Sequence, residues 1–256
     1  MRPGAPPHFH FIVLPGHEAM SRRAASFLED EIRRDPGILV AAASGSTPTR
    51  TYELLCDLLQ DEATRSPGLL QRLRIIKLDE WGGLSMDDPA TCETYLRRLL
   101  VEPLGIPPER YFSFRSDAGD PGAECGRIAR ALEAGGPIGV SVLGLGLNGH
   151  LGFNEPADAL EPFPHVARLS ASSLAHPMLE RSSASPRQGL TLGIGDILRS
   201  RRILLLVSGS QKRDVLRRLL EEPISPRFPA SFLWTHGDVT CLCDREAAEG
   251  LQPRRA

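Results

Sequence analysis

The chain has 256 residues, of which 41% are hydrophobic and 24% are charged, which is ordinary for a globular protein. Its net charge of −2 at pH 7 argues against a protein that binds nucleic acid or anionic membranes. The apolar runs are strand-sized and far below the roughly 20 residues of a membrane-spanning helix. Five scattered cysteines fit a reduced, cytoplasmic protein.

Short apolar runs alternate along the whole chain with segments of helical periodicity. We expect strands at Phe9–Leu14, Ile38–Ala43, Leu73–Leu78, Tyr111–Phe114, Ile138–Leu143, Gly189–Leu192, Ile203–Val207 and Val239–Cys243. We expect helices at about Glu18–Arg34, Pro48–Leu59, Cys92–Leu100, Ala123–Ala134 and Gln211–Leu220. This alternation predicts an α/β fold with a doubly wound, mostly parallel sheet and helices on both faces. Without a linker or an internal repeat, residues 1–256 are expected to form one domain.

The least regular stretch is 157–188, which is rich in proline and in small polar residues. A loop-rich excursion of this length in a compact fold is more often a lid or a binding segment than filler. A surface decoration is the alternative.

Ligands of open parallel sheets bind outside the carboxyl ends of the strands, so the residues that follow each strand are the candidates. After Ile38–Ala43 come Ser44, Gly45, Ser46 and Thr47, at the expected start of a helix. Small residues, hydroxyls and free helical N–H groups favour a bound anion such as phosphate. A tight turn with an ordinary N-cap explains the motif alone equally well.

After Leu73–Leu78 comes Asp79, a carboxylate at the end of an apolar strand. Desolvation there would raise its pKa and make it a better general base. Taken alone, a carboxylate that caps the following turn is the commoner explanation.

A glycine-dense loop from Gly144 to Pro156 follows the strand Ile138–Leu143 and contains His150 and Glu155. Histidine transfers protons at neutral pH, and a nearby carboxylate fixes its tautomer. A lone histidine is usually structural, but this setting favours a catalytic one.

Lys212 stands at a helix start after the strand Ile203–Val207, where the helix dipole disfavours a cation. A bound phosphate would explain it, and a solvated surface lysine is the alternative. Lysine is rare here, since Lys77 is the only other one among 30 basic residues. Cys241 and Cys243 are expected in the core, and we recognise no convincing metal-ligand spacing.

These segments together resemble the glucosamine-6-phosphate isomerase/deaminase family, which is related to the 6-phosphogluconolactonases, over nearly the whole chain. The resemblance rests on Ser44–Pro48, Leu78–Trp81, Asn148–His150, Phe153–Pro156, Leu190–Gly193 and Gly209–Lys212. Other segments are most similar to the galactosamine-6-phosphate isomerase branch, namely Lys77–Trp81, Thr91–Thr94, Ser113–Ser116 and Pro229–Trp234 with His236.

The resemblance implies a Rossmann-like fold and acid/base catalysis with no metal or cofactor. The loop of Ser44, Gly45, Ser46 and Thr47 would bind the substrate phosphate with help from Lys212. His150, assisted by Glu155, would open the sugar ring by proton transfer to the ring oxygen. Asp79 would then move a proton between C2 and C1, and the resulting imine would hydrolyse to a ketose 6-phosphate and ammonia.

Two departures from the family pattern stand out. Asn148 occupies a position where glucosamine-type members usually carry aspartate, and it marks the galactosamine-like branch. The basic lid residue that holds phosphate in glucosamine-type enzymes is not evident, and the match places that contact near His176. The basic residues of the family's allosteric site are also missing, so no activation of that kind is expected.

The expected reaction converts galactosamine 6-phosphate to tagatose 6-phosphate and ammonia. A glucosamine-6-phosphate deaminase that yields fructose 6-phosphate is the main alternative. A 6-phosphogluconolactonase and a non-catalytic sugar-phosphate sensor are less favoured, because of Phe153–Pro156 and because no DNA-binding module is recognised. The expected partner is a small amino-sugar phosphate, and the sequence leaves a homo-oligomer open.

Overall fold

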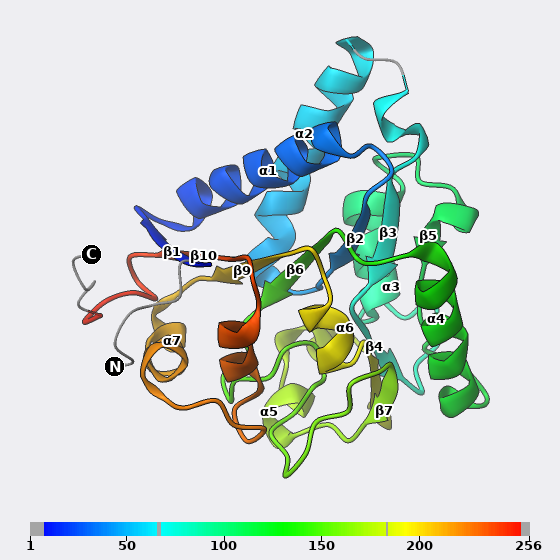
Figure 1. Ribbon diagram of the computed structural model, residues 1–256. Coiled ribbons are helices and arrows are strands. Elements are labelled where there is room, and N and C mark those ends of the chain that lie inside the picture. The colour runs from blue at the N-terminus through cyan, green and yellow to red at the C-terminus, as the bar shows by residue number, and fades with distance from the viewer. Residues whose placement is uncertain (1–7, 66–67, 183, 252–256) are drawn as a thin grey trace.

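Seven strands form one sheet in which every pairing is parallel (Figure 1). The computed structural model describes residues 8–65, 68–182 and 184–251. In spatial order the strands are β1 Phe9–Leu14, β10 Val239–Asp244, β9 Arg202–Val207, β6 Val140–Gly144, β2 Leu39–Ala42, β3 Arg74–Lys77 and β5 Tyr111–Phe112. All seven are predicted by the apolar runs of the sequence. The predicted ranges for β2 and β3 are longer, because burial continues at Ile38, Ala43, Leu73 and Leu78 beyond the paired residues.

Each central strand is buried on both faces, as parallel strands covered by helices must be. In β2, all four residues are buried. Ala41 faces one hydrophobic cluster, and its neighbours Val40 and Ala42 face the other. The period of two along the strand therefore divides the core into two layers, one on each side of the sheet.

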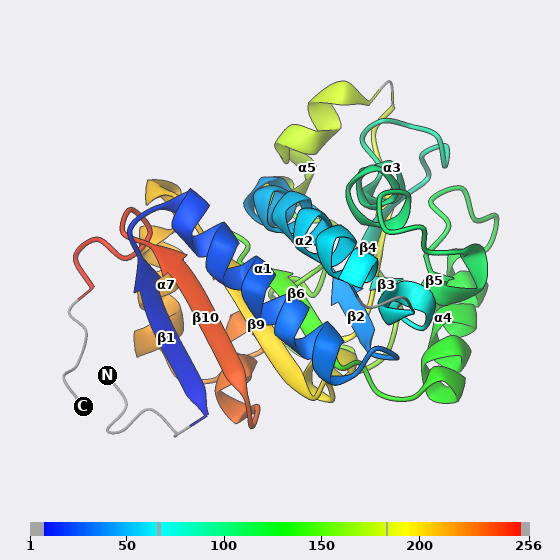
Figure 2. The same ribbon diagram turned by 90° about the horizontal axis from the view of Figure 1, so that it is seen from above.

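Helices cover both layers. The first layer is formed by α1 His17–Arg34, α2 Ser46–Arg65 and α3 Cys92–Leu96, and Figure 2 shows α1 and α2 lying over the sheet. The second layer is formed by α4 Pro121–Gly135, α6 Ile194–Leu198 and α7 Arg213–Glu221. This arrangement confirms the predicted α/β fold with helices on both faces of a parallel sheet.

A second sheet of three antiparallel strands has the order β4 Asp79–Gly82, β8 Gln188–Thr191 and β7 His165–Ala167. The sequence predicts β8 but neither of its neighbours. The strand β4 begins with two acidic residues, and β7 is too short to display an alternating pattern. In β8, Thr191 pairs with Asp79 on one side and with His165 on the other. The small sheet thus joins the candidate base Asp79 to segment 157–188.

Segment 157–188 is more ordered than its composition indicates. Besides β7, it contains the short helix α5 Ala171–Leu174 and the 3₁₀ turn Pro177–Arg181. The helix predicted at Cys92–Leu100 is also divided, since α3 ends at Leu96 and a π-helical turn, Arg97–Val101, follows it. The short helix α6 is not predicted. Among the described residues, no helix has the length and apolar character needed to cross a membrane.

Candidate active site

The candidate residues follow four neighbouring strands, β9, β6, β2 and β3. From β2 the chain proceeds outward to β3 and β5, and from β6 it proceeds in the opposite direction to β9 and β10. The boundary between β2 and β6 is therefore a topological switch point, where ligands of α/β proteins bind. The loops after these four strands converge on this place.

The loop after β2 is held in place by two side-chain hydroxyls that donate to one of its backbone carbonyls. Gly45 has φ +125°, a region that side-chain-bearing residues rarely adopt. Its carbonyl oxygen accepts hydrogen bonds from Thr49 Oγ1 at 2.9 Å and from the Tyr95 hydroxyl at 2.8 Å. Because α2 begins at Ser46, its first N–H groups and the positive end of its dipole face this loop. The loop has the properties of a preformed anion site.

Asp79 is the first residue of β4, directly after the end of β3. Burial and the neighbouring charge of Glu80 raise the pKa of the Asp79 carboxyl to about 7, although Lys77 and Cys92 act in the opposite direction. Gly152, in the loop after β6, lies opposite, since a Cβ atom built on it would be 3.6 Å from Asp79 Oδ2. A carboxyl with this pKa can accept and return a proton near neutral pH.

A buried thiol lies between the loop after β2 and Asp79. The Ser44 hydroxyl donates to Cys92 Sγ at 3.0 Å, and this sulfur lies 3.9 Å from Asp79 Oδ1. Burial raises the pKa of the Cys92 thiol well above its usual range, so the group remains protonated and able to donate. Cys92 therefore connects the anion loop to the carboxylate without carrying charge.

Beneath Asp79 lies a buried ionic cluster formed by Lys77, Glu80 and Glu93. Lys77 is 1% exposed, and its Nζ lies 2.5 Å from Glu80 Oε2 and 2.9 Å from Glu93 Oε2. Burial opposes its charge, but the two carboxylates raise the pKa of Lys77. Glu80 also accepts the backbone N–H groups of Cys92 and Glu93, at 3.0 and 2.9 Å, at the start of α3. The cluster holds α3 in place and sets the charge around Asp79.

His150 and Glu155 face one another in the loop after β6. Nδ1 of His150 lies 3.4 Å from Glu155 Oε2, which is longer than an ordinary hydrogen bond. Within the described part of the chain Nδ1 has no closer polar partner, so the carboxylate acts on it mainly through charge. Although burial opposes ionisation, the nearby His150 imidazole and the Ser173 and Asn148 donors lower the pKa of Glu155 to about 2. Glu155 is thus a fixed anion beside the imidazole.

Asn148 links the two members of this pair. Its Nδ2 donates to Glu155 Oε2 at 2.8 Å, and its Oδ1 accepts the backbone N–H of His150 at 3.1 Å. The reverse orientation of the amide would bring two acceptors together, so these contacts determine which end is nitrogen. An aspartate at this position would have to be protonated to make the same contacts.

Lys212 extends from the start of α7 to the loop after β6. Its Nζ donates to the Leu145 carbonyl at 2.5 Å, and burial lowers the pKa of the ammonium group. The turn before it is fixed by Asp244, which accepts the Gly209 N–H and the Ser208 hydroxyl. Lys212 is therefore a positioned, partly desolvated cation and not a solvated surface lysine.

His176 lies between α5 and the 3₁₀ turn of segment 157–188, and its ring centroid is 6.1 Å from that of Trp81. Burial lowers the pKa of His176, and electrostatic interactions with His150 and Lys212 lower it further. The His176 ring therefore interacts electrostatically with residues that follow β6 and β9. Segment 157–188 thus contributes one side chain to the region where the four loops meet.

Comparison with known proteins decides the family. The family model of glucosamine-6-phosphate isomerases/6-phosphogluconolactonase matches residues 17–241, which is most of the chain. The chain belongs to this family. The predicted resemblance is confirmed, and the chain is an enzyme of a sugar-phosphate isomerase/deaminase family. Sugar phosphates, the substrates that the family description names, agree with the predicted class of small-molecule partner.

Individual family members are similar over nearly their whole length. The protein AgaI of Escherichia coli (strain K12) is 39% identical over 226 residues, which cover 88% of each chain. Glucosamine-6-phosphate deaminase 1 of Bacillus subtilis (strain 168) is 38% identical over 242 residues, covering 93% of this chain and 97% of the relative. A solved monomeric glucosamine-6-phosphate deaminase has a TM-score of 0.85 at 37% identity, covering 93% of this chain and 98% of its own.

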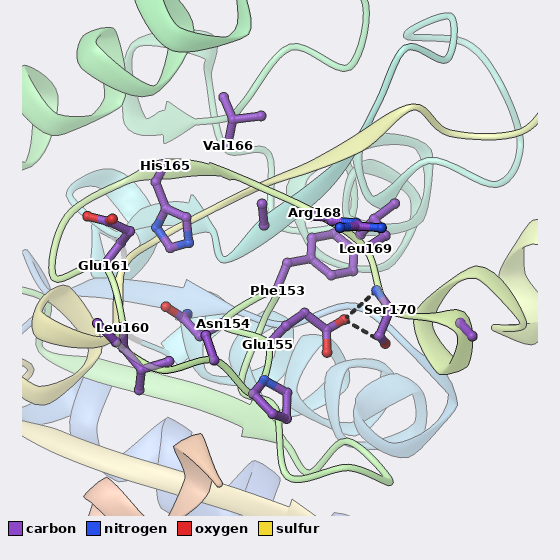
Figure 3. A pocket seen from close by; sticks show the side chains of 15 residues that line it. Phe153, Asn154, Glu155, Leu160, Glu161, His165, Val166, Arg168, Leu169 and Ser170 are labelled. Atoms are coloured by element: carbon purple, nitrogen blue, oxygen red, sulfur yellow. Dashed lines mark hydrogen bonds between the residues drawn. The ribbon is translucent and has the colours of Figure 1, made fainter. Parts of the chain in front are cut away.

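A cavity of about 550 Å³ lies next to the loop that follows β6. Figure 3 shows Glu155 at its wall, directed toward Ser170, with Phe153 and Leu169 beside them. Asp79, His150 and residues 44–47 are not part of its lining. The cavity therefore adjoins the candidate site instead of coinciding with it. Across the described ranges, no three His, Cys, Asp or Glu side chains are grouped to hold a metal ion.

Sequence reasoning missed several residues that shape this site. Cys92, Glu80 and Glu93 lie in segments that carry the resemblance, but the sequence assigns them no role, because their contacts with Asp79 and Lys77 join separate elements. The one available signal is Lys77, a charged residue inside an apolar strand of a chain that has only one other lysine. The positions that the sequence does single out, at the ends of β2, β3, β6 and β9, are brought to one edge of the sheet.

Proposed function

We propose that this enzyme converts galactosamine 6-phosphate and water to tagatose 6-phosphate and ammonia. The observation that carries the proposal is Asp79, a carboxyl with a pKa of about 7, set across from the loop that contains the His150–Glu155 pair. A base and an acid on facing loops, with an anion loop after the neighbouring strand, are what an amino-sugar phosphate needs to isomerise.

The phosphate binds in the loop of Ser44, Gly45, Ser46 and Thr47, with Lys212 as the cation. Two features support this assignment: α2 begins inside the loop, and burial of the Lys212 ammonium makes an anionic partner favourable. His176 supplies a further contact from segment 157–188, which acts as the lid. Its position within range of Lys212 supports that role.

The reaction then begins with proton transfers between the substrate and the side chains of the site. His150, polarised by Glu155, transfers a proton to the ring oxygen as the ring opens to the C1 aldehyde. Asp79 removes the C2 proton, which the C1 carbonyl acidifies, while the C1 oxygen takes back the proton that the C1 hydroxyl lost on ring opening. The enolamine formed in this way then receives the C2 proton from Asp79 at C1. The product of this step is an imine at C2, and attack of water on that carbon releases ammonia and leaves the ketose. Asn148 holds Glu155 and His150 in position relative to one another by hydrogen bonds to both.

Two observations support galactosamine 6-phosphate over glucosamine 6-phosphate. The first is Asn148, where glucosamine-type members usually carry aspartate. The second is the galactosamine-like segment Pro229–Trp234, which contacts the catalytic loop. The Ala230 N–H donates to the Gly149 carbonyl at 2.8 Å, and the ring of Phe228 packs against Gly149. The alternative, glucosamine 6-phosphate, is favoured by the similarity to the Bacillus subtilis relative, which is a glucosamine-6-phosphate deaminase.

The proposal is tested by supplying equal concentrations of the two amino-sugar phosphates and of 6-phosphogluconolactone. Ammonia is measured by a coupled assay, and the ketose product is identified by NMR. We expect ammonia and tagatose 6-phosphate, with a kcat/KM for galactosamine 6-phosphate that is about tenfold higher or more. Faster turnover of glucosamine 6-phosphate would overturn the sugar assignment, and hydrolysis of the lactone alone would overturn the deaminase.

A further inference from the structure

The two carboxylate oxygens of Glu155 serve different parts of the molecule. Oε2 faces the catalytic loop, where it accepts from Asn148 at 2.8 Å and lies 3.4 Å from His150 Nδ1. Oε1 faces segment 157–188. There it accepts from the Ser170 hydroxyl at 2.9 Å, from the Ser170 N–H at 3.3 Å and from the Ser173 hydroxyl.

Both serines belong to the start of α5. Ser170 is its N-cap residue and accepts the Ser173 N–H at 3.2 Å. That contact is the capping hydrogen bond, so the bonds from both hydroxyls to Glu155 are additional to it. Ser173 is 2% exposed, and its hydroxyl is therefore committed to the carboxylate. In Figure 3, Glu155 and Ser170 are joined across the gap between the two segments.

The two serine hydroxyls fix the orientation of the Glu155 carboxylate, because hydrogen bonds as well as packing hold this side chain. Charge-assisted hydrogen bonds of this kind are about twice as strong as neutral ones, and they fix the direction of each lone pair. With Oε1 held by the serines, Oε2 is left to face His150. Without them, the carboxylate could rotate toward the adjacent cavity, whose lining includes Glu155 and Ser170.

We propose that Ser170 and Ser173 are positioning residues that hold Glu155 against His150 and thereby connect the catalytic carboxylate to segment 157–188. This inference rests on the proposed function, in which Glu155 assists His150 in ring opening. Its consequence is that ring opening requires α5 to be docked. Movement of this segment away from the sheet would release Oε1 and remove the support of the imidazole at the same time.

The test compares S170A, S173A and the double variant S170A/S173A with wild type, using ammonia release from galactosamine 6-phosphate. The main phosphate contacts, residues 44–47 and Lys212, do not involve these serines, so we expect kcat of the double variant to fall about 10–100-fold, while KM changes less than about threefold. Each single variant should show part of this loss. Ser170→Thr keeps both the hydroxyl and the cap and should restore turnover to within about twofold of wild type.

Ser172→Ala is the matched control. Its exposed hydroxyl contacts Ser170 Oγ at 2.9 Å, and the Glu155 carboxylate accepts no bond from it, so its kcat should remain at the wild-type value. Circular dichroism and thermal unfolding identify variants that fold, and a folded single variant decides the question if the double variant does not fold. A folded S173A or double variant with wild-type kcat would overturn the inference, as would equal losses in S172A. If wild type released no ammonia from either amino sugar, the proposed function itself would fail.

Discussion

The side-chain amide of Asn148 donates a 2.8 Å hydrogen bond to Oε2 of Glu155, the same oxygen that faces His150. Because Asn148 is a neutral donor, Glu155 is the one ionised carboxylate among Asn148, His150 and Glu155. The pKa of Glu155, about 2, agrees with this arrangement. Asn148 therefore has a direct electrostatic role beside Glu155.

Asn148→Asp should destabilise the folded enzyme in a pH-dependent manner. Two carboxylates would then meet where a donor now stands, so one of them would have its folded-state pKa raised above the unfolded value of about 4. The free energy of unfolding therefore falls as pH rises and this carboxyl ionises. We expect the variant to be about 1–3 kcal/mol less stable at pH 7, with the difference shrinking toward pH 4.

Urea unfolding at pH 4, 5, 6 and 7 measures this effect. Asn148→Ala removes the same hydrogen bond without adding charge, so its loss of stability should vary little over this range. If the aspartate variant lost the same free energy of unfolding at pH 4 and at pH 7, repulsion with Glu155 would not be the cause.

The pH dependence of turnover should follow the pKa of Asp79 and the charges of the buried cluster that set it. A base must be ionised to act, so kcat/KM should fall as pH drops through about 7, the pKa of Asp79. Glu80 raises that pKa and Lys77 lowers it. We therefore expect Glu80→Gln to move the acid limb to lower pH and Lys77→Met to move it to higher pH, by about one pH unit each.

Glu93→Gln is the control for this prediction, because Glu93 belongs to the same cluster but is not among the groups that act on Asp79. Its acid limb should coincide with that of wild type. Shifts of the same sign in the Glu80 and Lys77 variants would rule out a role for their charges in setting the Asp79 pKa.

Much of the fold is predictable because burial leaves a pattern in the sequence. The run Ile203–Val207 is apolar throughout and forms β9 at the centre of the sheet. The short strands β4 and β7 leave no such pattern, since they form by pairing with β8. The candidate site divides in the same way. His150 stands out at the end of a strand, whereas Ser170 and Ser173 matter only because folding brings them to Glu155.

Lys212→Ala should weaken substrate binding mainly through the phosphate. Its ammonium group is partly desolvated and now donates to the Leu145 carbonyl, so an anion has a positioned cation to meet. We expect KM to rise about 10–100-fold with a smaller change in kcat. Inhibition by non-phosphorylated galactosamine should be unaffected.

Arg213→Ala provides the matched control for Lys212. This neighbouring cation bonds the Glu246 carbonyl at 2.9 Å and pairs with Glu249, away from the catalytic loop. Its KM should equal that of wild type. An equal loss of affinity for phosphorylated and non-phosphorylated ligands in the Lys212 variant would refute the phosphate role.

The most direct test of the central claim compares wild type with Asp79→Asn on galactosamine 6-phosphate, with ammonia and tagatose 6-phosphate measured together. Asparagine keeps the shape but cannot accept the C2 proton, so turnover should fall by a factor of about 10³ or more. Phosphate-dependent binding, measured by calorimetry with galactitol 6-phosphate, should stay within about threefold of wild type. Near-normal release of both products by the variant would contradict the proposed proton transfer at C2.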